Sequence, residues 1–375
     1  MTTAQRPTAP STVTLIPGDG IGKEIAPVLQ SCVAATGAPI IWESYDAGES
    51  AVAQGLPPLP QELLESIRRN KVAIKGPTGT PIGTQGHRSV NVGMRRALDL
   101  FACVRPFTYY PGVPTRIKDP EGIDFTIIRE NTEDLYAGIE FAVGEPSTES
   151  LIREITQRSG ERVREDSAIA IKPISITGSD RIVRYAFDYA REHGKTRVTA
   201  VTKANIMKLT DGLFLERARA VARDYPEIQL EEMLVDNANM QITARPERFQ
   251  VIVTPNLYGD ILSDHAAAVV GGLGVAPGAN IGDDYALFEA VHGTAPDIAG
   301  KGLANPTALL LSGAMMLRHL GYTREGDNLE RAVADTLKEG TYVTGDIKRG
   351  AGVSTTDMGE AIERQVRYLR NAQRT

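Results

Sequence analysis

The chain has 375 residues, of which 42% are hydrophobic and 23% charged, and its formal net charge is −6. This length and composition predict a globular protein with one large or two linked α/β domains, and the charge argues against a nucleic-acid or acidic-membrane partner. No run of residues is long and apolar enough to span a membrane, and residues 1–12 lack the apolar core of a signal peptide. The two cysteines, Cys32 and Cys103, cannot form a disulfide framework and favour a reducing, cytoplasmic compartment.

Strand-like and helix-like patterns alternate along the chain, which favours a largely parallel sheet. Strands are expected at residues 13–17, 40–48, 71–77, 124–131, 197–203, 229–237 and 249–256. Helices are expected from about residue 23 and over 60–70, 89–100, 211–225, 259–272 and 305–321. A further helix is expected near Thr177 and Asp180, whose spacing is that of a capping box. The charged segment 145–166 interrupts this order, and we expect it to protrude as a β-arm.

The first loop, "PGDGIG" at residues 17–22, resembles a nucleotide-binding turn. A Rossmann fingerprint requires Gly-x-Gly-x-x-Gly, and Glu43 lies at a plausible distance for its acidic residue. Here the third glycine is replaced by Lys23. The pattern therefore favours a tight structural turn over a pyrophosphate site, although it leaves both open.

Two aspartates in "TPNLYGDILSD", Asp260 and Asp264, are spaced to lie on one face of a helix. Like charges in that arrangement repel unless a cation lies between them, and Mg²⁺ prefers carboxylate oxygens. Asp236 and Lys203 each end another expected strand, and open α/β sheets bind ligands beyond the carboxyl ends of their strands. A solvated helix face and a metal site both remain possible on this evidence.

Basic residues gather in the segment 88–105 and at the end of the expected strand 124–131, and arginine is the best geometric match for a carboxylate. They are Arg88, Arg95, Arg96, Arg105 and Arg129. Ser89 and Asn91 stand at an expected helix start, where free backbone amides favour an anion. Together these residues suggest a polycarboxylate pocket, and separately they read as surface charges.

Longer motifs then point to a family. They are "PGDGIG", "RENTEDLYAGIE" (129–140), "KANIMKLTDGLF" (203–214), "TPNLYGDILSD" (254–264), "GGLGVAPGANIG" (271–282) and "HGTAPDIAGKGLANPT" (292–307). In these motifs the chain resembles the isocitrate/isopropylmalate dehydrogenases, which are metal-dependent β-decarboxylating dehydrogenases. The resemblance implies an α/β fold that is not a Rossmann fold. It implies a large cofactor-binding domain (1–100 and 271–375), a small domain with the dimer interface (101–133 and 176–270) and a clasp insertion between subunits (134–175).

The resemblance also implies the reaction, in which a 2-hydroxy acid with a carboxylate on C3 loses hydride to a nicotinamide and then loses CO₂. Lys203 is implied as the base and Tyr136 as the acid. The implied homodimer shares its active sites, so that Asp260 and Asp264 hold Mg²⁺ or Mn²⁺ together with Asp236 of the partner subunit. The implied substrate contacts are Lys75, Thr80, Ser89, Asn91, Arg95, Arg105, Arg129 and Asn205.

Family members that oxidise isocitrate resemble this chain in carrying Ser and Asn, two apart, before the first arginine. Ser89 and Asn91 can bond a third carboxylate, so we expect isocitrate as the substrate. Homoisocitrate and 3-isopropylmalate remain alternatives, and a non-catalytic regulatory subunit is an alternative of another class.

The cofactor loop implied by the resemblance is "HGTAPDIAG", which indicates NAD rather than NADP. Asp297 can accept hydrogen bonds from both ribose hydroxyls and would repel a 2′-phosphate, whereas NADP-using relatives tend to have lysine and tyrosine in place of Asp297 and Ile298. The other implied cofactor contacts are His292, Gly293 and Asn305. Lys348 and Arg349 depart from this expectation, because they are close to the position where NADP enzymes hold an arginine.

Overall fold

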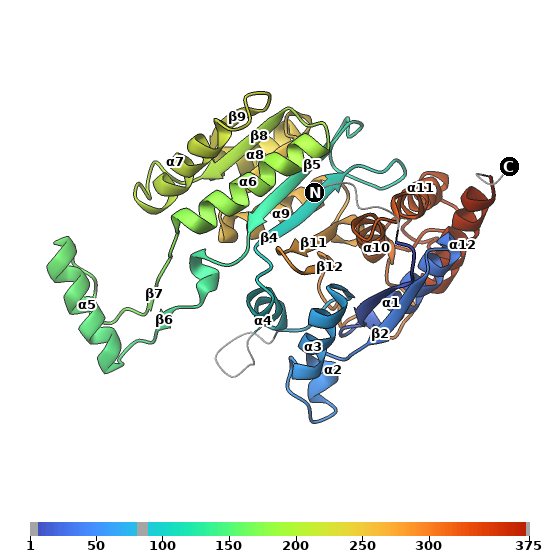
Figure 1. Ribbon diagram of the computed structural model, residues 1–375, viewed down its shortest axis with the longest axis horizontal. Helices are drawn as coiled ribbons and strands as arrows, with labels where there is room; N and C mark the ends of the chain where they lie inside the picture. The colour runs from blue at the N-terminus through green and yellow to red at the C-terminus, as the bar shows by residue number, and fades with distance from the viewer. Residues whose placement is uncertain (1–6, 81–88, 373–375) are drawn as a thin grey trace.

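The computed structural model describes residues 7–80 and 89–372 and has a mixed α/β fold built on one ten-stranded sheet (Figure 1). Arg88, one of the basic residues noted in the sequence, lies outside the described residues. The strands follow each other across the sheet in the order β2-β1-β3-β12-β11-β4-β5-β10-β8-β9.

The strands of this sheet are β1 (Ser11–Ile16), β2 (Ile40–Ser44), β3 (Val72–Lys75), β4 (Ala102–Thr108), β5 (Asp124–Glu130), β8 (Arg197–Thr202), β9 (Gln229–Leu234), β10 (Val251–Thr254), β11 (Pro277–Ile281) and β12 (Ala286–Ala290). The α-helices are α1 (Gly22–Thr36), α2 (Glu49–Val52), α3 (Gln61–Asn70), α4 (Val90–Ala97), α5 (Pro146–Ser159), α6 (Ile176–Glu192), α7 (Thr210–Ala222), α8 (Val235–Ala244), α9 (Asn256–Val269), α10 (Thr307–His319), α11 (Thr323–Glu339) and α12 (Thr355–Ala372). Short 3₁₀ helices cover Asp134–Ala137, Pro246–Arg248 and Leu273–Val275.

The sheet is largely parallel, as expected, but its central pairs are antiparallel. Pairs within β2-β1-β3-β12 and within β5-β10-β8-β9 are parallel. The three pairs between them, β12-β11, β11-β4 and β4-β5, are antiparallel. The two halves of the sheet therefore run in opposite directions, and the reversal occurs at the centre.

Both ends of the chain contribute to one half of the molecule. Figure 1 shows α1, α11 and α12 side by side, and it shows the middle of the chain, with α6, α7 and α8, around the other end of the sheet. The helix α10 is buried along almost its whole length beneath β11 and β12, because its residues are apolar or small on every face. The division into domains implied by the resemblance remains a prediction.

The insertion protrudes from the body but is not a β-arm. Two short antiparallel strands, β6 (Glu140–Phe141) and β7 (Ile169–Ala170), lead to the helix α5 at its far end (Figure 1). Pro146 occupies the first turn of α5, and Gly160 follows its end with φ of 73°. Proline at a helix start and a left-handed glycine just past its end are ordinary helix signals, and they outweigh the charged composition.

The capping residue of α6 is Ser175, not Thr177. The Ser175 Oγ accepts a hydrogen bond from the Gly178 backbone N–H at 2.9 Å, so the helix begins at Ile176. Within residues 7–80 and 89–372, no helix is both long and apolar enough to cross a membrane.

The central strands border a cavity of about 980 Å³ on one of their faces, which we call the rear cavity. Its floor includes Val104, Ala279 and Phe288, while Tyr189 of α6 and Met315 of α10 form opposite walls. The rear cavity therefore lies between the two halves of the molecule.

Candidate active site

Sheet register gathers the polar site residues on the face opposite the rear cavity. Lys75 is paired with Glu289 across β3 and β12. Asn280 is paired with Cys103 of β4, which is paired with Arg129 of β5. Paired residues share a face and alternate residues return to it, so Arg105 joins this group while Val104 and Ala279 face the rear cavity.

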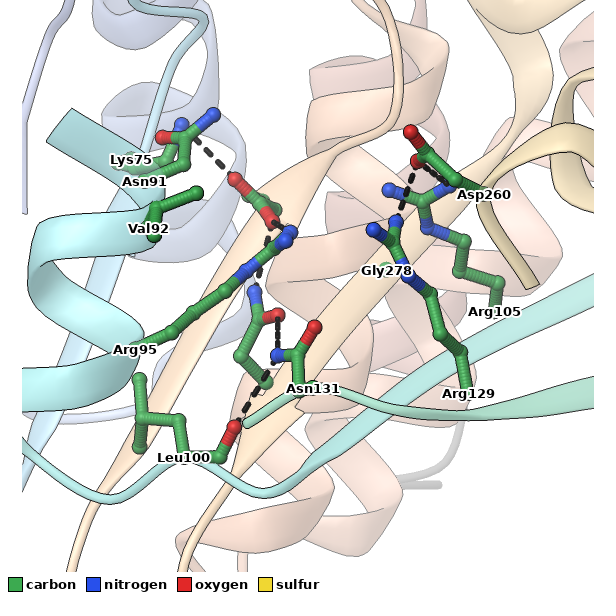
Figure 2. A network of polar contacts seen from close by, with 12 residues as sticks. Lys75, Asn91, Val92, Arg95, Leu100, Arg105, Arg129, Asn131, Asp260 and Gly278 are labelled. Carbon is green, nitrogen blue, oxygen red and sulfur yellow. Dashed lines mark hydrogen bonds and ion pairs between the residues drawn. The ribbon is translucent and has the colours of Figure 1, made fainter. Parts of the chain in front are cut away.

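Glu289 is the buried centre of one cluster, and the sequence reasoning missed it. Its carboxylate contacts Lys75 Nζ at 2.8 Å and Arg95 Nη2 at 3.1 Å, and it accepts a hydrogen bond from Asn280 Nδ2 at 2.7 Å (Figure 2). Burial alone would raise the pKa of Glu289, but the charges of Lys75 and Arg95 hold that pKa well below its ordinary value. A lone carboxylate in the apolar strand "ALFEA" was the signal available in the sequence.

Asp260 is the centre of a second cluster at the end of β5. Arg129, 1% exposed, donates to Asp260 Oδ1, and its Nε and Nη2 both donate to Asn256 Oδ1. Arg105 Nη1 lies 3.7 Å from the same Asp260 oxygen. Gly259 of α9 allows this packing, because a Cβ there would lie 2.5 Å from Arg129 Cγ.

Tyr136 and Asp264 complete the part of the site that this chain supplies. The Tyr136 hydroxyl donates to Asp260 Oδ2, and burial together with that bond raises the pKa of Tyr136. Burial would also raise the pKa of Asp260, but Arg129 and Arg105 hold it below its ordinary value. The pKa of Asp264 is raised by burial and by the charge of Asp260, with Arg105 opposing the increase.

The start of α4 borders a smaller polar cavity of about 130 Å³. Ser89 is the N-cap of α4 and accepts from the Val92 N–H at 3.4 Å. Asn91 lines the cavity with Thr78, whose hydroxyl donates to Asn91 Oδ1 at 3.0 Å. Thr80, which was expected to assist in this pocket, is exposed to solvent.

Lys203 and Asp236 form their own pair, away from the Asp260 cluster. Lys203 Nζ lies 2.5 Å from Asp236 Oδ1, which lowers the pKa of Asp236. Asn205, in the turn that follows, is exposed. Among the described residues, no group of three or more His, Cys, Asp or Glu is arranged to hold a metal ion, so one chain does not bring Asp236 to Asp260 and Asp264.

The first glycine-rich loop is a structural turn. Three of its backbone N–H groups already have protein acceptors: Asp19 N–H donates to Pro77 O at 2.7 Å, Ile21 N–H to Thr294 O at 3.0 Å and Gly22 N–H to Asp19 O at 2.9 Å. A Cβ on Gly20, whose φ is 53°, would lie 2.1 Å from Thr294 O. The turn therefore supports the loop that begins at Thr294, and its bonded amides are not available to a phosphate.

The segment 292–305, which includes this loop, contains the residues expected to hold the cofactor. His292 lines the polar cavity, and burial lowers its pKa. Asp297 is exposed, whereas Asn305 is buried and donates to Asp346 Oδ2 at 3.0 Å. The Asp346 contact brings the C-terminal loop beside Asn305, and Lys348 in that loop donates to Gly340 O at 3.2 Å.

The family model for isocitrate/isopropylmalate dehydrogenases matches residues 12–362. The chain belongs to the isocitrate/isopropylmalate dehydrogenase family. It is 48% identical to the mitochondrial NAD isocitrate dehydrogenase catalytic subunit 5 of Arabidopsis thaliana, over 95% of this chain and 88% of that one. It is 45% identical to an NADP isocitrate dehydrogenase of Thermus thermophilus, over 93% of this chain and 66% of that one. The crystal structure of isocitrate dehydrogenase from Methylococcus capsulatus matches with a TM-score of 0.87 and 46% identity, covering 95% of this chain and 99% of that chain.

Family members named for a different substrate or for a regulatory role match this chain at similar sequence identity. A chloroplastic 3-isopropylmalate dehydrogenase of Solanum tuberosum is 47% identical over 87% of this chain and 80% of its own length. A mitochondrial regulatory subunit of the NAD isocitrate dehydrogenase of Dictyostelium discoideum is 44% identical over 94% of this chain and 91% of its own length. The comparisons therefore establish the family and its fold. The substrate, the choice between NAD and NADP, and the presence of catalytic activity must be argued from the site.

Proposed function

We propose that this protein catalyses the metal-dependent oxidative decarboxylation of isocitrate to 2-oxoglutarate and CO₂ with reduction of NAD. The observation that carries the proposal is the charge of the site. Four buried cations form ion pairs with two carboxylates, Glu289 and Asp260, and they are Lys75, Arg95, Arg105 and Arg129. The excess positive charge suits an anion with several carboxylates.

The polar start of α4 distinguishes isocitrate from its alternatives. Asn91 lines the small cavity and Ser89 stands two residues before it at the helix start, and an isopropyl group there could not accept a hydrogen bond from either side chain. A third carboxylate would satisfy them. This argument favours isocitrate over 3-isopropylmalate, and homoisocitrate remains a further alternative within the class.

Asp260 and Asp264 fit a divalent cation. The raised pKa of Asp264 arises from burial and from the charge of Asp260, and a cation between the two carboxylates would remove that penalty. We propose that Asp236 of the partner subunit completes the site. When bound, Mg²⁺ or Mn²⁺ would supply a Lewis acid that polarises the substrate oxygens.

Side chains of the protein would donate and accept the protons of the reaction. Tyr136, whose pKa is raised, keeps its hydroxyl proton at neutral pH and can donate it to the carbon that loses CO₂. Lys203 of the partner subunit would accept the proton of the substrate hydroxyl. Arg95, Arg105 and Arg129 would hold the carboxylates and keep the reacting carbon in place.

The choice of NAD over NADP rests on Asp297. This exposed carboxylate stands on the loop held by the first turn, where it can accept from ribose hydroxyls and would repel a 2′-phosphate. The basic residues Lys348 and Arg349 lie on an exposed loop, where solvent screens their charge. Asp297 therefore outweighs them.

A homodimer with shared sites is part of the proposal. Nine large apolar side chains between residues 135 and 261 are exposed on this chain: Leu135, Ile139, Val143, Ile171, Ile176, Ile206, Leu209, Met240 and Ile261. Exposed apolar surface of this extent is typical of a face that another subunit covers. A cytoplasmic location remains our prediction, although several relatives are named mitochondrial.

A regulatory subunit without activity is the alternative of a different class, and the regulatory relative from Dictyostelium discoideum makes it concrete. Against it, this chain retains Tyr136, Lys203, Asp236, Asp260 and Asp264. A silent subunit is expected to have lost at least one residue of this set.

One experiment tests these alternatives together. The purified chain is assayed alone with Mg²⁺ for kcat/KM on isocitrate, homoisocitrate and 3-isopropylmalate, each with NAD and with NADP. We expect the highest value for isocitrate with NAD, and we expect Asn91→Leu to lower kcat/KM more for isocitrate than for 3-isopropylmalate. A preference for another acid refutes the substrate, and no turnover of any acid revives the regulatory alternative.

A further inference from the structure

Two buried asparagines connect the halves of the sheet behind the site. Asn131 follows β5, and Asn280 lies in β11; they are 5% and 0% exposed. Asn131 Nδ2 donates to Leu100 O at 3.1 Å and to Asn280 Oδ1 at 2.9 Å. Asn280 Nδ2 then donates to Glu289 Oε1 at 2.7 Å.

The contacts fix the orientation of both amides. A backbone carbonyl only accepts, so the Asn131 amide nitrogen must face Leu100. The ionised carboxylate of Glu289 also only accepts, so the Asn280 nitrogen must face Glu289 and its oxygen must face Asn131. The chain of hydrogen bonds therefore has one direction, and it ends on Glu289.

Glu289 in turn fixes Arg95. The oxygen that accepts from Asn280 also contacts Arg95 Nη2, while the other oxygen contacts Lys75. Arg95 Nε is buried and has no hydrogen-bond partner among the described residues, and the same holds for Arg105 Nη1. Buried N–H groups without acceptors are costly, so these two indicate where an anionic ligand would bind.

We propose that Asn131 and Asn280 are positioning residues, which hold the Glu289 carboxylate and through it orient Arg95 for a substrate carboxylate. This inference rests on the proposed function insofar as the ligand is a carboxylate. The two asparagines act through Glu289 and do not touch the substrate. The hydrogen bonds run from the end of β5 through Asn280 of β11 to Glu289 of β12, so they join the two oppositely directed halves of the sheet at the site.

The test is Asn280→Asp, which keeps the size of the side chain and replaces its donor nitrogen with oxygen. When protonated, the new carboxyl can still donate to Glu289. Once ionised it repels Glu289 and competes for Arg95, so a substrate that needs Arg95 should bind more weakly as pH rises. Because one proton is linked to binding, the weakening should reach about tenfold per pH unit above the shared pKa of the two carboxyls.

Other charged groups near Glu289 do not produce this signature. They are Lys75 on β3, Arg95 on α4, Arg105 on β4 and His292 after β12. The pKa of His292 is lowered by burial, so His292 stays neutral above pH 7. The wild-type protein should therefore show no such loss of binding between about pH 7 and pH 9, where lysine and arginine keep their charge.

Asn70→Asp is the matched control. Asn70 Nδ2 donates to the Glu43 carboxylate at 3.0 Å, so the exchange makes the same chemical change outside the site. The measurements are KM and kcat against pH and, independently of turnover, the dissociation constant of the substrate by calorimetry with Mg²⁺. Asn280→Asp should raise KM and the dissociation constant with pH, with a smaller effect on kcat, and Asn70→Asp should match the wild type.

The outcomes separate this inference from the proposed function. Both variants are compared with the wild type on whichever acid the wild type binds best. If that acid is not isocitrate, the proposed substrate fails and the comparison still tests the asparagines. A pH-independent KM for Asn280→Asp, or a fall in kcat and thermal stability alone, overturns the positioning role. Binding of none of the three acids to the wild-type protein overturns both.

Discussion

Single buried charges dominate the site at the scale of the residue. Glu289 is 6% exposed; its carboxylate forms ion pairs with two cations and accepts a hydrogen bond from one side-chain amide. Removing one partner of a buried ion pair leaves the other charge uncompensated, which typically costs about 3–5 kcal/mol. Glu289 is therefore expected to matter for stability as well as for the orientation of Arg95.

Glu289→Gln should destabilise the protein by about 3 kcal/mol at pH 7, since Lys75 and Arg95 lose their counter-charge. The folded-state pKa of Glu289 lies below its ordinary value of 4.5, so its contribution is complete above pH 4.5 and is lost as pH falls further. The difference in the free energy of unfolding between wild type and variant should accordingly become smaller below pH 4.5. Urea unfolding at fixed protein concentration measures it, and Glu43→Gln on the exposed edge is the control. An equal difference at pH 7 and pH 3.5 would contradict the linkage.

The nucleotide preference is also decided by single residues. Replacing Asp297 with Lys and Ile298 with Tyr should shift the ratio of kcat/KM for NAD and NADP toward NADP by at least about tenfold, because a repulsive charge becomes an attractive one. The measurement uses isocitrate and Mg²⁺ at fixed ionic strength. Lys348→Ala is the companion variant and should leave the ratio almost unchanged. No movement in the double variant would mean that the adenosine lies elsewhere.

At the scale of the element, the first turn acts on the loop that it supports. Gly20→Ala places a Cβ 2.1 Å from Thr294 O at a φ of 53°. We expect a higher KM for NAD with little change in the KM for isocitrate, since the displaced loop is the proposed cofactor loop. Gly55→Ala is the control, because its φ of 77° is strained in the same way and nothing lies within 4 Å. If both variants behave alike, backbone strain rather than contact with Thr294 is responsible.

Elements that depend on local sequence were predicted well. Spacing alone placed Asp260 and Asp264 on α9 and Ser89 at the start of α4, and the structure confirms both positions. The helix α5 was missed although Pro146 and Gly160 mark its ends, because its charged composition was given too much weight. The antiparallel centre of the sheet was missed because no strand was expected at β4, β11 or β12, and because strand direction depends on pairing between distant segments.

The long-range contacts of the site could not be read from the chain. Arg95 and Glu289 are 194 positions apart, and Asn131 and Asn280 are 149 apart. Asn131 and Asn280 stand within quoted motifs, but no local pattern gives them or Glu289 a role, and the contacts arise only where register brings distant strands together. The motif resemblance supplied the arginines and aspartates as a set, but it did not supply Glu289 or the asparagines.

For the whole molecule, the separation of Lys203 and Asp236 from the Asp260 cluster motivates a test of shared sites. A Lys203→Met chain mixed with a Tyr136→Phe chain should form heterodimers with one intact site each, so activity should return from two inactive proteins. Each variant incubated alone under the same exchange conditions is the control. Mass spectrometry establishes that the subunits have exchanged. If activity does not return once exchange is established, each site is built from one chain.

The central strands separate the polar site on one face of the sheet from the rear cavity on the other. One face of β4 and β11 carries Arg105 and Asn280, and the other face forms the floor between α6 and α10. A rotation of the two halves about these strands that narrows the gap on the substrate side must widen the gap on the other side. The volume of the rear cavity would then increase as the substrate side closes. A bulky side chain that fills the rear cavity would keep the two halves from rotating.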